Sequence, residues 1–503
     1  MLKANETVGD LARRCIHNQR PASKDFSAKK SPLRLLRSAC RHLPRIAGEY
    51  KKGLTAALLL PALALSACTL APKYEQPALP VAPQWSAPAP QASNTQLTWR
   101  ELFLDPQLQQ TVDLALTNNR DLRIAAFNVQ QARAVYGIQR AGLLPGVDAS
   151  GSGSKSHTDA DGDSESYNAN LGLSWELDLF GRIRSLKNAA LEDFFASEAN
   201  RDAVEISLIA SVANAWLTLA ADQDALRLAR DTYTSRQEAY RIAEGRARIG
   251  VIGDLELSQQ TTLLEQSRAE VAALETAVDQ DKSALTLLVG TTLPENLIPQ
   301  TLPGNAVADV PVGLPSEVLL ARPDVLSAEH NLRAANADIG AARAAMFPSI
   351  SLTGSTGFAS SDLGSLFESG NGRWSYGVGI NMPIFAGGGP INALRGAKAR
   401  QDIAVVQYER AIQSAFNDVN QALAVRARID ERLDAQTAAT NAAQRTFDLS
   451  NARYSAGSDS YLTLLDAQRT LYGSQQSLIN LRYLRAANLV ALYRALGNDA
   501  SLK

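Results

Sequence analysis

Cysteine and histidine are scarce in this chain of 503 residues, which narrows the chemistry it can perform. The three cysteines, Cys15, Cys40 and Cys68, all lie within the first 68 residues, and only His157 and His330 lie beyond them. The remainder of the chain therefore has no disulfide framework and no cysteine-based metal site. Glycine-rich phosphate-binding motifs and zinc-type spacings are also missing. We expect no metal, no cofactor and no enzymatic activity. His157 is predicted in a loop and His330 in a helix, and we expect each to have a surface or helix-packing role rather than a catalytic one.

Positive charge is also scarce outside the first segment. Residues 1–67 carry 13 Lys/Arg and 4 Asp/Glu, whereas residues 68–503 carry 37 and 47, a net charge of −10. A basic leader followed by an acidic body argues against nucleic acid as a partner.

Proline is missing from two long spans, between Pro145 and Pro294 and after Pro390. Within them, residues 182–244 and 397–456 contain neither glycine nor proline and consist mostly of good helix formers. Continuous helices of this length would be about 90 Å long at ~1.5 Å per residue. A bundle of separate short helices would need breakers that these spans lack.

Each long helix ends at a glycine-containing turn, the first at Gly250 and Gly253 and the second at Gly457. The return helices carry a seven-residue apolar repeat, which keeps one face against a partner over many turns. We predict two long coiled-coil hairpins, 182–289 and 390–496. The repeats are Leu257, Leu264, Val271, Val278 and Leu285 in the first, and Leu465, Tyr472, Ile479, Ala486 and Tyr493 in the second.

The start of the chain has the pattern of a secretory signal peptide, which we assign to residues 1–67. Lys51 and Lys52 precede a short apolar run that ends in Leu65-Ser66-Ala67-Cys68, which resembles the bacterial lipobox whose cysteine is acylated. The alternative is a buried apolar segment with a chance cysteine. Residues 1–50 are long for the region before such an apolar run, so the start of the chain could be mis-assigned. The residue after the cysteine is Thr69 rather than Asp, and the resemblance to bacterial lipoproteins then implies delivery to the outer membrane. Residues 68–98 are proline-rich and predict an extended lipidated tether rather than a packed element.

The sequence repeats itself. A shift of 203 residues aligns Gly137 with Gly340 and Gly151 with Gly354, and a slightly larger shift aligns Gly250 with Gly457. Ordered matches of this density indicate a duplicated unit. We divide the chain into a first repeat, 99–290, a linker or equatorial segment, 291–321, and a second repeat, 322–497.

Each repeat contains a pair of predicted strands, near 145–178 and near 349–384. Alternating apolar residues suit transmembrane β-strands, which need ~9–11 residues per crossing; a soluble sheet packed on the helices is the alternative. Four strands cannot close a membrane barrel, so several copies of the chain must contribute strands to one barrel. Two copies would give eight strands and three copies would give twelve. The predicted lipid-facing residues are Leu171, Leu173, Trp175, Trp374, Tyr376, Val378 and Ile380, and the predicted lumen-facing residues are Asn170, Ser174, Gly379 and Asn381.

Three motifs, together with the lipobox and the duplication, resemble TolC-type outer-membrane efflux proteins, in particular the lipoprotein branch that includes OprM and NodT. They are Arg322-Pro323-Asp324-Val325, Ala344-Ala345-Met346-Phe347-Pro348-Ser349-Ile350 and Ser460-Tyr461-Leu462-Thr463-Leu464-Leu465-Asp466-Ala467-Gln468. The resemblance covers roughly residues 68–497. It implies a mainly α fold with a β-barrel part, as a homotrimer with a twelve-stranded membrane barrel continued by a periplasmic α-barrel. It also implies a periplasmic adaptor and an inner-membrane transporter of the resistance-nodulation-division class as partners.

The resemblance further implies a periplasmic gate on the hairpins. Leu462 and Asp466 match the family's apolar and acidic constriction rings, and Tyr454 matches a tyrosine of the closing polar links. Glu256 stands where a family acid lies, whereas Asp459 stands where a relative carries an arginine.

Four alternative functions are considered for this sequence. The first is the passive exit duct of a drug-efflux pump in the outer membrane, and the second is the same duct serving peptide or protein secretion or metal-ion export. A surface coiled coil or adhesin is disfavoured by the alternating strands. A periplasmic enzyme is disfavoured because no nucleophile–base or metal constellation is visible.

Overall fold

The computed structural model describes residues 69–85, 98–309, 316–497 and 499, all of which belong to the compact unit Leu63–Lys503. The predicted signal peptide and the predicted lipid-attachment residue Cys68 lie outside the described residues.

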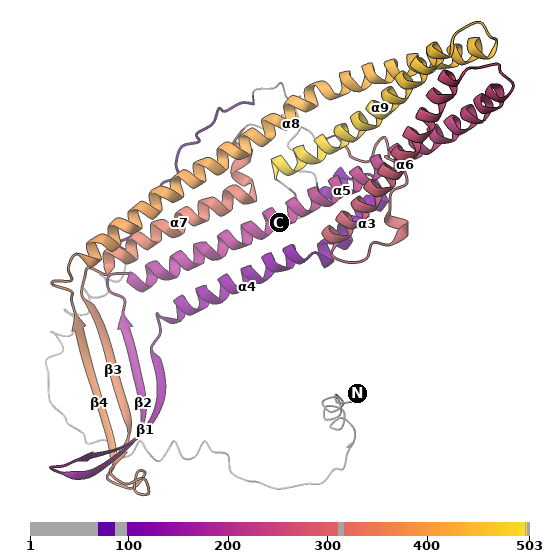
Figure 1. The fold of residues 1–503 in the computed structure, drawn as a ribbon. Helices are drawn as coiled ribbons and strands as arrows, with labels where there is room; N and C mark the ends of the chain where they lie inside the picture. The colour runs from indigo at the N-terminus through magenta and orange to yellow at the C-terminus, as the bar shows by residue number, and fades with distance from the viewer. Residues whose placement is uncertain (1–68, 86–97, 310–315, 498, 500–503) are drawn as a thin grey trace, which may run out of the picture. The chain divides into compact units, whose positions relative to one another are not determined.

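Long helices dominate the described part of the chain, and they come in matched pairs (Figure 1). Helices α4 and α7 have 22 residues each, α5 and α8 have 67, and α6 and α9 have 36. The two halves thus repeat one architectural unit. The bounds are α2 Trp99–Leu102, α3 Pro106–Asn118, α4 Arg120–Ala141, α5 Arg182–Arg248, α6 Asp254–Val289, α7 Pro323–Ala344, α8 Gly389–Ser455 and α9 Tyr461–Leu496, with short 3-10 helices η2 Glu295–Leu297 and η3 Ser316–Ala321.

Helices α4, α5, α7 and α8 lie side by side in that order, because α5 contacts both α4 and α7, and α7 contacts α8. Helix α6 returns along α5, and helix α9 returns along α8 and also contacts α5. The seven-residue repeats account for this pairing, since Leu285 and Leu465 are buried and Leu257 and Ile479 are half-buried.

Helix α5 contains one 18-residue stretch that is apolar enough to cross a membrane, but 56% of this stretch is buried inside the protein. Its apolar composition is that of a core helix.

The four strands form one antiparallel sheet in the order β1-β2-β3-β4. They are β1 Gly146–Thr158, β2 Gly162–Leu177, β3 Ser349–Ser360 and β4 Gly372–Asn381. Strand β4 ends before Pro383, which has no N–H to donate to a ladder.

The prediction that His157 lies in a loop was wrong. His157 lies in β1 opposite Asp163 of β2, and its Nδ1 atom is 2.6 Å from Asp163 Oδ1. The Ser- and Asp-rich composition of this hairpin indicated a loop, but backbone pairing does not depend on apolar side chains, so both strands continue to Thr158 and Gly162. His330 does pack on a helix, with its Nδ1 atom 2.7 Å from Glu192 Oε2 of α5.

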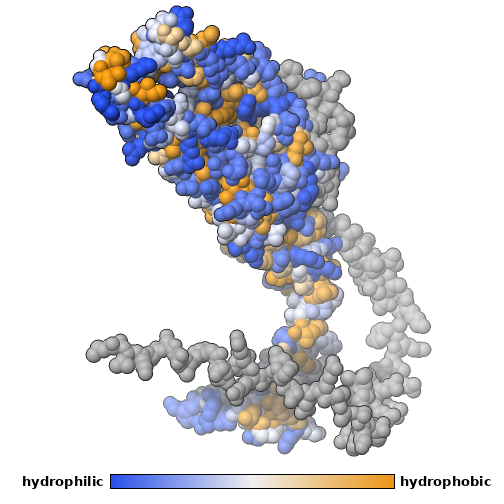
Figure 2. All heavy atoms as spheres, turned by 90° about the vertical axis from the view of Figure 1, so that its right-hand side faces the viewer, coloured by the Kyte–Doolittle hydropathy of each residue, from blue (hydrophilic) through white to orange (hydrophobic). Residues whose placement is uncertain are grey.

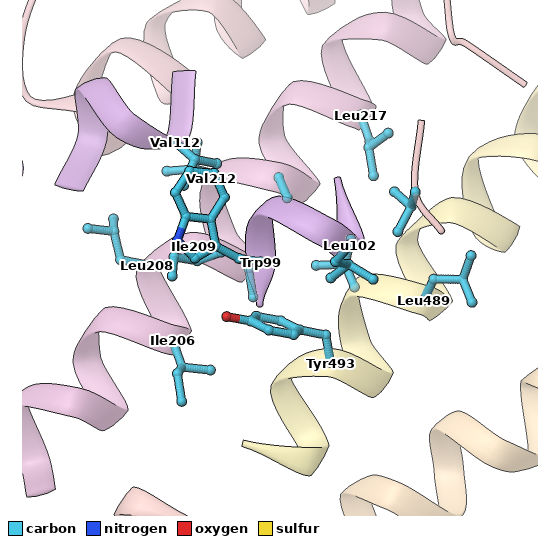
Figure 3. Close-up of a cluster of buried hydrophobic side chains, with 14 of the residues drawn as sticks. Trp99, Leu102, Val112, Ile206, Leu208, Ile209, Val212, Leu217, Leu489 and Tyr493 are labelled. Atoms are coloured by element: carbon cyan, nitrogen blue, oxygen red, sulfur yellow. The ribbon is translucent and has the colours of Figure 1, made fainter. Parts of the chain in front are cut away.

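The main hydrophobic core lies where the short helices meet α5 and α9 (Figure 3). Trp99, Val112, Ile209 and Tyr493 are buried there. Buried side chains of this size each stabilise the fold by ~1.5–3 kcal/mol. The equatorial segment joins this core through the bridge between Phe103 and Val307.

Residues 69–85, which we name the N-terminal strap, are extended as predicted but are packed against the protein. Asn336 Nδ2 donates to Pro72 O at 2.9 Å, Tyr74 Oη donates to Glu329 Oε1 at 3.1 Å, and the Trp85 ring stacks on Phe416 at 5.1 Å. The expectation of an unpacked tether was wrong for this segment, because its rings and carbonyl groups find partners on α7 and α8.

Candidate functional site

The sheet has two chemically different faces, which the strand register defines. Directly paired residues lie on the same face. Leu171, Leu173, Val378 and Ile380 thus share one face, while Asn170, Ser174, Gly379 and Asn381 share the opposite one.

The apolar face is open to the surroundings in the single chain. Leu171 is 53% exposed, Trp374 75%, Tyr376 82% and Ile380 70%. Figure 2 shows a hydrophobic patch among hydrophilic side chains where the strands lie. An exposed apolar patch on a folded sheet marks an interaction surface for a membrane or another protein.

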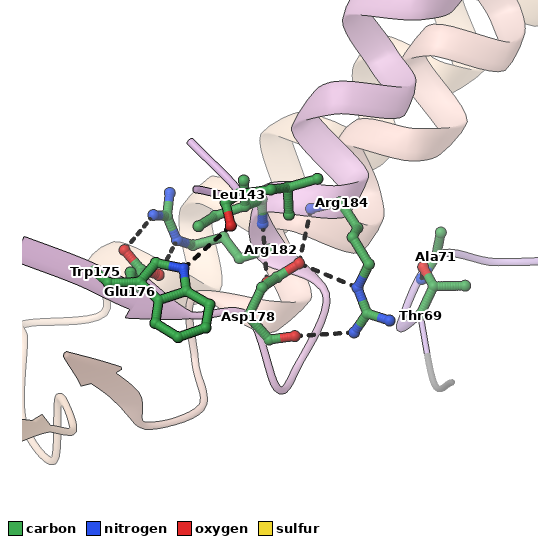
Figure 4. Close-up of polar contacts among 9 residues, drawn as sticks. Thr69, Ala71, Leu143, Trp175, Glu176, Asp178, Arg182 and Arg184 are labelled. Atoms are coloured by element: carbon green, nitrogen blue, oxygen red, sulfur yellow. Dashed lines mark hydrogen bonds and ion pairs between the residues drawn. The ribbon is translucent and has the colours of Figure 1, made fainter. Parts of the chain in front are cut away.

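Trp175 lies on the apolar face but differs from its neighbours there. It is half-buried, and its Nε1 atom donates to Leu143 O at 3.1 Å, just beyond the end of α4 (Figure 4). The sequence analysis predicted Trp175 only as a lipid-facing residue and did not predict the contact of its ring with the helical part of the chain.

The passage from β2 into α5 is held by ion pairs (Figure 4). Arg182 donates to both carboxylate oxygens of Glu176 at 3.0 and 2.7 Å. Asp178 accepts from the backbone N–H groups of Ile183 and Arg184 at 3.0 and 2.8 Å, so its carboxylate satisfies free donors at the N-terminus of α5. This junction fixes the direction in which the helix leaves the sheet.

The far ends of the two helical hairpins turn in the same way. Gly250 has φ 73° and Gly457 has φ 72°, a left-handed conformation that favours glycine. Val251 N donates to Arg246 O and Ser458 N donates to Arg453 O, both at 2.9 Å, which closes each helix end. Gly253, also predicted as a turn residue, has a negative φ as the residue before α6.

A polar cluster joins the two hairpins near these turns. Tyr454 Oη of α8 donates to Glu256 Oε1 of α6 at 2.9 Å, and Arg246 Nη1 of α5 donates to Tyr454 Oη at 3.4 Å. We call Tyr454, Glu256 and Arg246 the hairpin link. Burial, followed by the hydrogen bond to Glu256, raises the pKa of Tyr454 above its ordinary value, so its hydroxyl stays protonated at neutral pH.

The start of α9 presents one buried and one exposed face. Tyr461, Leu464 and Leu465 are buried, and the Tyr461 ring packs edge-on against Tyr454 at 5.6 Å. Leu462 is 67% exposed, and Asp466, one turn further along, is also exposed. Both side chains are therefore free to face a partner or a solvent-filled space.

Asp459 is bound within its own hairpin. Its carboxylate lies 3.3 Å from Arg453 Nε and accepts from Ser460 N at 2.9 Å and from Thr463 Oγ1 at 3.2 Å. It takes no part in the hairpin link.

Sequence reasoning missed Arg246, Arg453 and Tyr461 as members of this region. Arg246 is 208 residues from Tyr454 in the sequence, so no local pattern connects the two. The available signal was the arginine that lies four residues before each turn glycine, Arg246 before Gly250 and Arg453 before Gly457. No group of three or more metal-ligating side chains occurs among the residues that the structure describes.

A sheet with one apolar and one polar face, continued by long helical hairpins, has the architecture of a TolC-type outer-membrane channel. Comparisons with known proteins agree with this assignment of the architecture. The sequence matches the outer membrane efflux protein family over residues 111–291 and 314–498.

Two relatives and one solved structure illustrate the similarity. The antibiotic efflux pump outer membrane protein ArpC and the toluene efflux pump outer membrane protein TtgC, both of Pseudomonas putida, are each 44% identical over 457 residues, covering 88% of this chain and 94% of the relative. The open state of the Neisseria gonorrhoeae MtrE outer membrane channel is 41% identical, with a TM-score of 0.79, and covers 86% of this chain and 98% of that one.

The chain belongs to the outer membrane efflux protein family. It is an outer-membrane channel of an efflux pump, and the predictions of its family, fold class and location are confirmed. The relatives named here are pump components rather than enzymes.

Proposed function

We propose that this chain is the passive exit duct of a tripartite pump, working as a homotrimer that conducts small molecules from the periplasm to the exterior. One observation carries the proposal: the four-stranded sheet exposes an apolar and a polar face, and its edge strands β1 and β4 each pair with one strand within the described chain. In lipid such edges must be paired, which requires further copies.

Three copies fit better than two for a physical reason. An eight-stranded barrel has an interior just wide enough for its own side chains, and barrel diameter grows with strand number. Twelve strands would leave room for a water-filled passage lined by the polar face, with Asn170, Ser174, Gly379 and Asn381 in the lumen. Leu171, Leu173, Trp374, Tyr376, Val378 and Ile380 would then face lipid, with Trp175 at the boundary with the helices.

The hairpin ends would form the periplasmic gate. The exposed faces of Leu462 and Asp466 would meet their symmetry mates near the axis, where leucines exclude water and acids attract cations. The hairpin link would hold the gate closed by tying α8 to α5 and α6. The turns at Gly250 and Gly457 could absorb the movement when a periplasmic adaptor spreads the hairpins, and Asp459 would stabilise only its own turn.

The N-terminus would add a lipid anchor. Acylation of Cys68 would place its chains in the outer membrane, next to the start of the N-terminal strap at Thr69. The strap would then connect the anchor to α7 and α8 through contacts such as Asn336 with Pro72.

Antibiotics and organic solvents are the proposed cargo, and a resistance-nodulation-division transporter is the proposed energy source. The names of similar proteins, which refer to antibiotic and toluene efflux pumps, support this choice. The pore itself would perform no chemistry. The second candidate is peptide or protein secretion or metal-ion export through the same duct, because the partner transporter rather than the pore would select the cargo.

A deletion strain complemented with the wild-type gene tests the proposed cargo. We expect deletion to lower the minimal inhibitory concentrations of dyes, antibiotics and toluene, and the gene to restore them. Unchanged susceptibility to these compounds, together with impaired secretion or metal tolerance, would instead establish the second candidate.

A further inference from the structure

The apolar face of the sheet can be divided into rows that run across the strands, because directly paired residues lie on the same face. The rows nearest the helices carry large apolar side chains, which fill that part of the face. They are Leu177, Ile350 and Ile380 in the first row and Trp175, Leu352 and Val378 in the second.

Two rows further from the helices contain mostly small residues. One of these rows consists of Ala149, Leu171, Thr356 and Trp374. The next row consists of Gly151, Ala169, Phe358 and Gly372. Residues of both rows line a hollow of about 730 Å³, which we name the sheet hollow. Small residues thus leave a space between the large side chains of this part of the face.

The loop that joins β3 to β4 lies at the end of the sheet away from the helices and supplies one wall of the sheet hollow (Figure 1). Leu366 of this loop is buried, and Asn371 Nδ2 donates to Ser365 O at 2.7 Å, so the loop is held in a defined shape. Phe367 lies edge-on against Phe358, with 5.4 Å between the ring centroids, yet it is 71% exposed. An ordered aromatic ring therefore borders the hollow with most of its surface uncovered.

The position of the sheet hollow along the strands determines its depth in the membrane. Phe358 follows Ile350 by eight residues, about 26 Å along β3 at ~3.3 Å per residue. The apolar band of a membrane barrel is ~25 Å tall, so these two residues lie near its opposite boundaries. The helices leave the sheet beside Ile350 and lie in the periplasm in the proposed duct, so Phe358 lies in the outer leaflet. This depth rests on the proposed function.

Beyond the sheet hollow the same face becomes polar. Tyr167 and Ser360 belong to the next row, and Lys155 and Glu165 of the row after it form an ion pair at 2.9 Å. Hydroxyl groups and charges of both signs suit a head group made of sugars and phosphates, because such a head group both donates and accepts hydrogen bonds. The outer leaflet of an outer membrane contains a lipid of this kind, the lipid A part of lipopolysaccharide.

Water is a poor occupant of a hollow with apolar walls, because apolar surface is stabilised by apolar neighbours. At this depth the acyl chains of the membrane are the apolar groups that surround the protein. We infer that the sheet hollow binds one acyl chain of lipid A, in contact with Phe367 and Trp374, and that the lipid head group lies against Lys155 and Tyr167.

Titration of the purified full chain with lipid A in detergent, followed by native mass spectrometry, tests this inference. The variant G372L fills the sheet hollow, and nothing in the structure lies within 4 Å of a Cβ built on Gly372. Its matched control G354L adds the same side chain to the same face outside the hollow, where the nearest atoms are 3.8 Å from the Cβ. The variant F367S removes the wall that the loop supplies. Its control is L363S, because Leu363 is a loop residue that is 62% exposed and does not line the hollow.

We expect the wild type to bind lipid A more tightly than phosphatidylethanolamine of matched chain length. G372L and F367S should bind lipid A about tenfold more weakly, the effect of removing about two CH₂ groups from apolar contact. G354L and L363S should bind like the wild type. Wild-type affinity of both G372L and F367S would show that lipid A does not occupy the hollow. Equal affinity of the wild type for the two lipids, weakened equally by G372L, would assign the hollow to a phospholipid chain and overturn the choice of lipid A.

Two further measurements separate the possible failures. The same spectra report the assembly of each variant, and if G372L loses its assembly, the comparison of F367S with L363S decides the test. Conductance of the wild type in planar bilayers tests the proposed duct independently. A conducting wild type without specific lipid A binding refutes the lipid site alone, whereas a wild type that does not conduct refutes the proposed duct.

Discussion

Replacing Tyr454 with Phe should open the periplasmic end of the channel. The substitution removes the hydroxyl that donates to Glu256 Oε1 at 2.9 Å and accepts from Arg246 Nη1 at 3.4 Å. Hydrogen bonds to charged groups contribute ~1.5–3 kcal/mol each, and the half-buried position favours the lower end of that range. Counting only the shorter bond, the one to Glu256, at about 1.5 kcal/mol per copy, three copies of the link would together stabilise the closed trimer by roughly 4–5 kcal/mol. At ~1.4 kcal/mol per factor of ten, their loss would raise the open-to-closed ratio about 1,000-fold.

Single-channel recording in planar bilayers measures this effect. We expect Y454F and E256Q to show a higher basal conductance and open probability than the wild type. The matched control is Y240F, because Tyr240 lies on α5 and its hydroxyl forms no hydrogen bond with the residues that the structure describes. If Y454F and E256Q conduct like Y240F and the wild type, the hairpin link does not hold the gate closed.

Three further predictions concern the gate, the anchor and the helical hairpin. In bilayers, L462S should raise the basal conductance and D466A should weaken cation selectivity; unchanged values for both would place the constriction elsewhere. Mass spectrometry should find a mature N-terminus at an acylated Cys68, and an intact leader or unmodified cysteine would contradict the anchor. Burial and the nearby charge of Asp222 raise the pKa of Asp281 to about 6. Between pH ~4 and 6 the folded protein therefore binds more protons than the unfolded chain, so the free energy of unfolding falls as the pH rises through this window. The variant D281N should therefore raise the free energy of unfolding at pH 7.5 by about 1 kcal/mol after solvent screening, which is measured as a higher thermal midpoint, but it should have no such effect at pH 4. Equal shifts of the midpoint at both pH values would contradict this sign.

The parts of the fold that depend on local or periodic signals could be predicted from the sequence. The absence of helix breakers between residues 182 and 244 predicted α5, whose observed end is four residues further on. Alternation of apolar and polar residues predicted the two faces of the sheet, because side chains of a strand point to opposite sides in turn. Leu171 and Asn170 therefore fell on the expected opposite faces.

The parts that depend on contacts between distant residues could not be predicted in the same way. The N-terminal strap packs because Tyr74 reaches Glu329, 255 residues away, and nothing in its proline-rich composition encodes that partner. Arg246 and Tyr454 lie on different hairpins, so only the folded arrangement of both hairpins brings the two side chains together. Trp175 matched the pattern of an exposed ring, yet its indole N–H lies within hydrogen-bonding distance of Leu143 O.

Thiol labelling during bilayer recording tests most directly whether the polar face of the sheet lines a transmembrane pore. Asn170 and Leu171 are adjacent in β2 but lie on opposite faces. A charged, water-soluble thiol reagent should reduce the conductance of N170C strongly and leave that of L171C close to the wild-type value. Equal block of both variants, or block of L171C alone, would contradict the account.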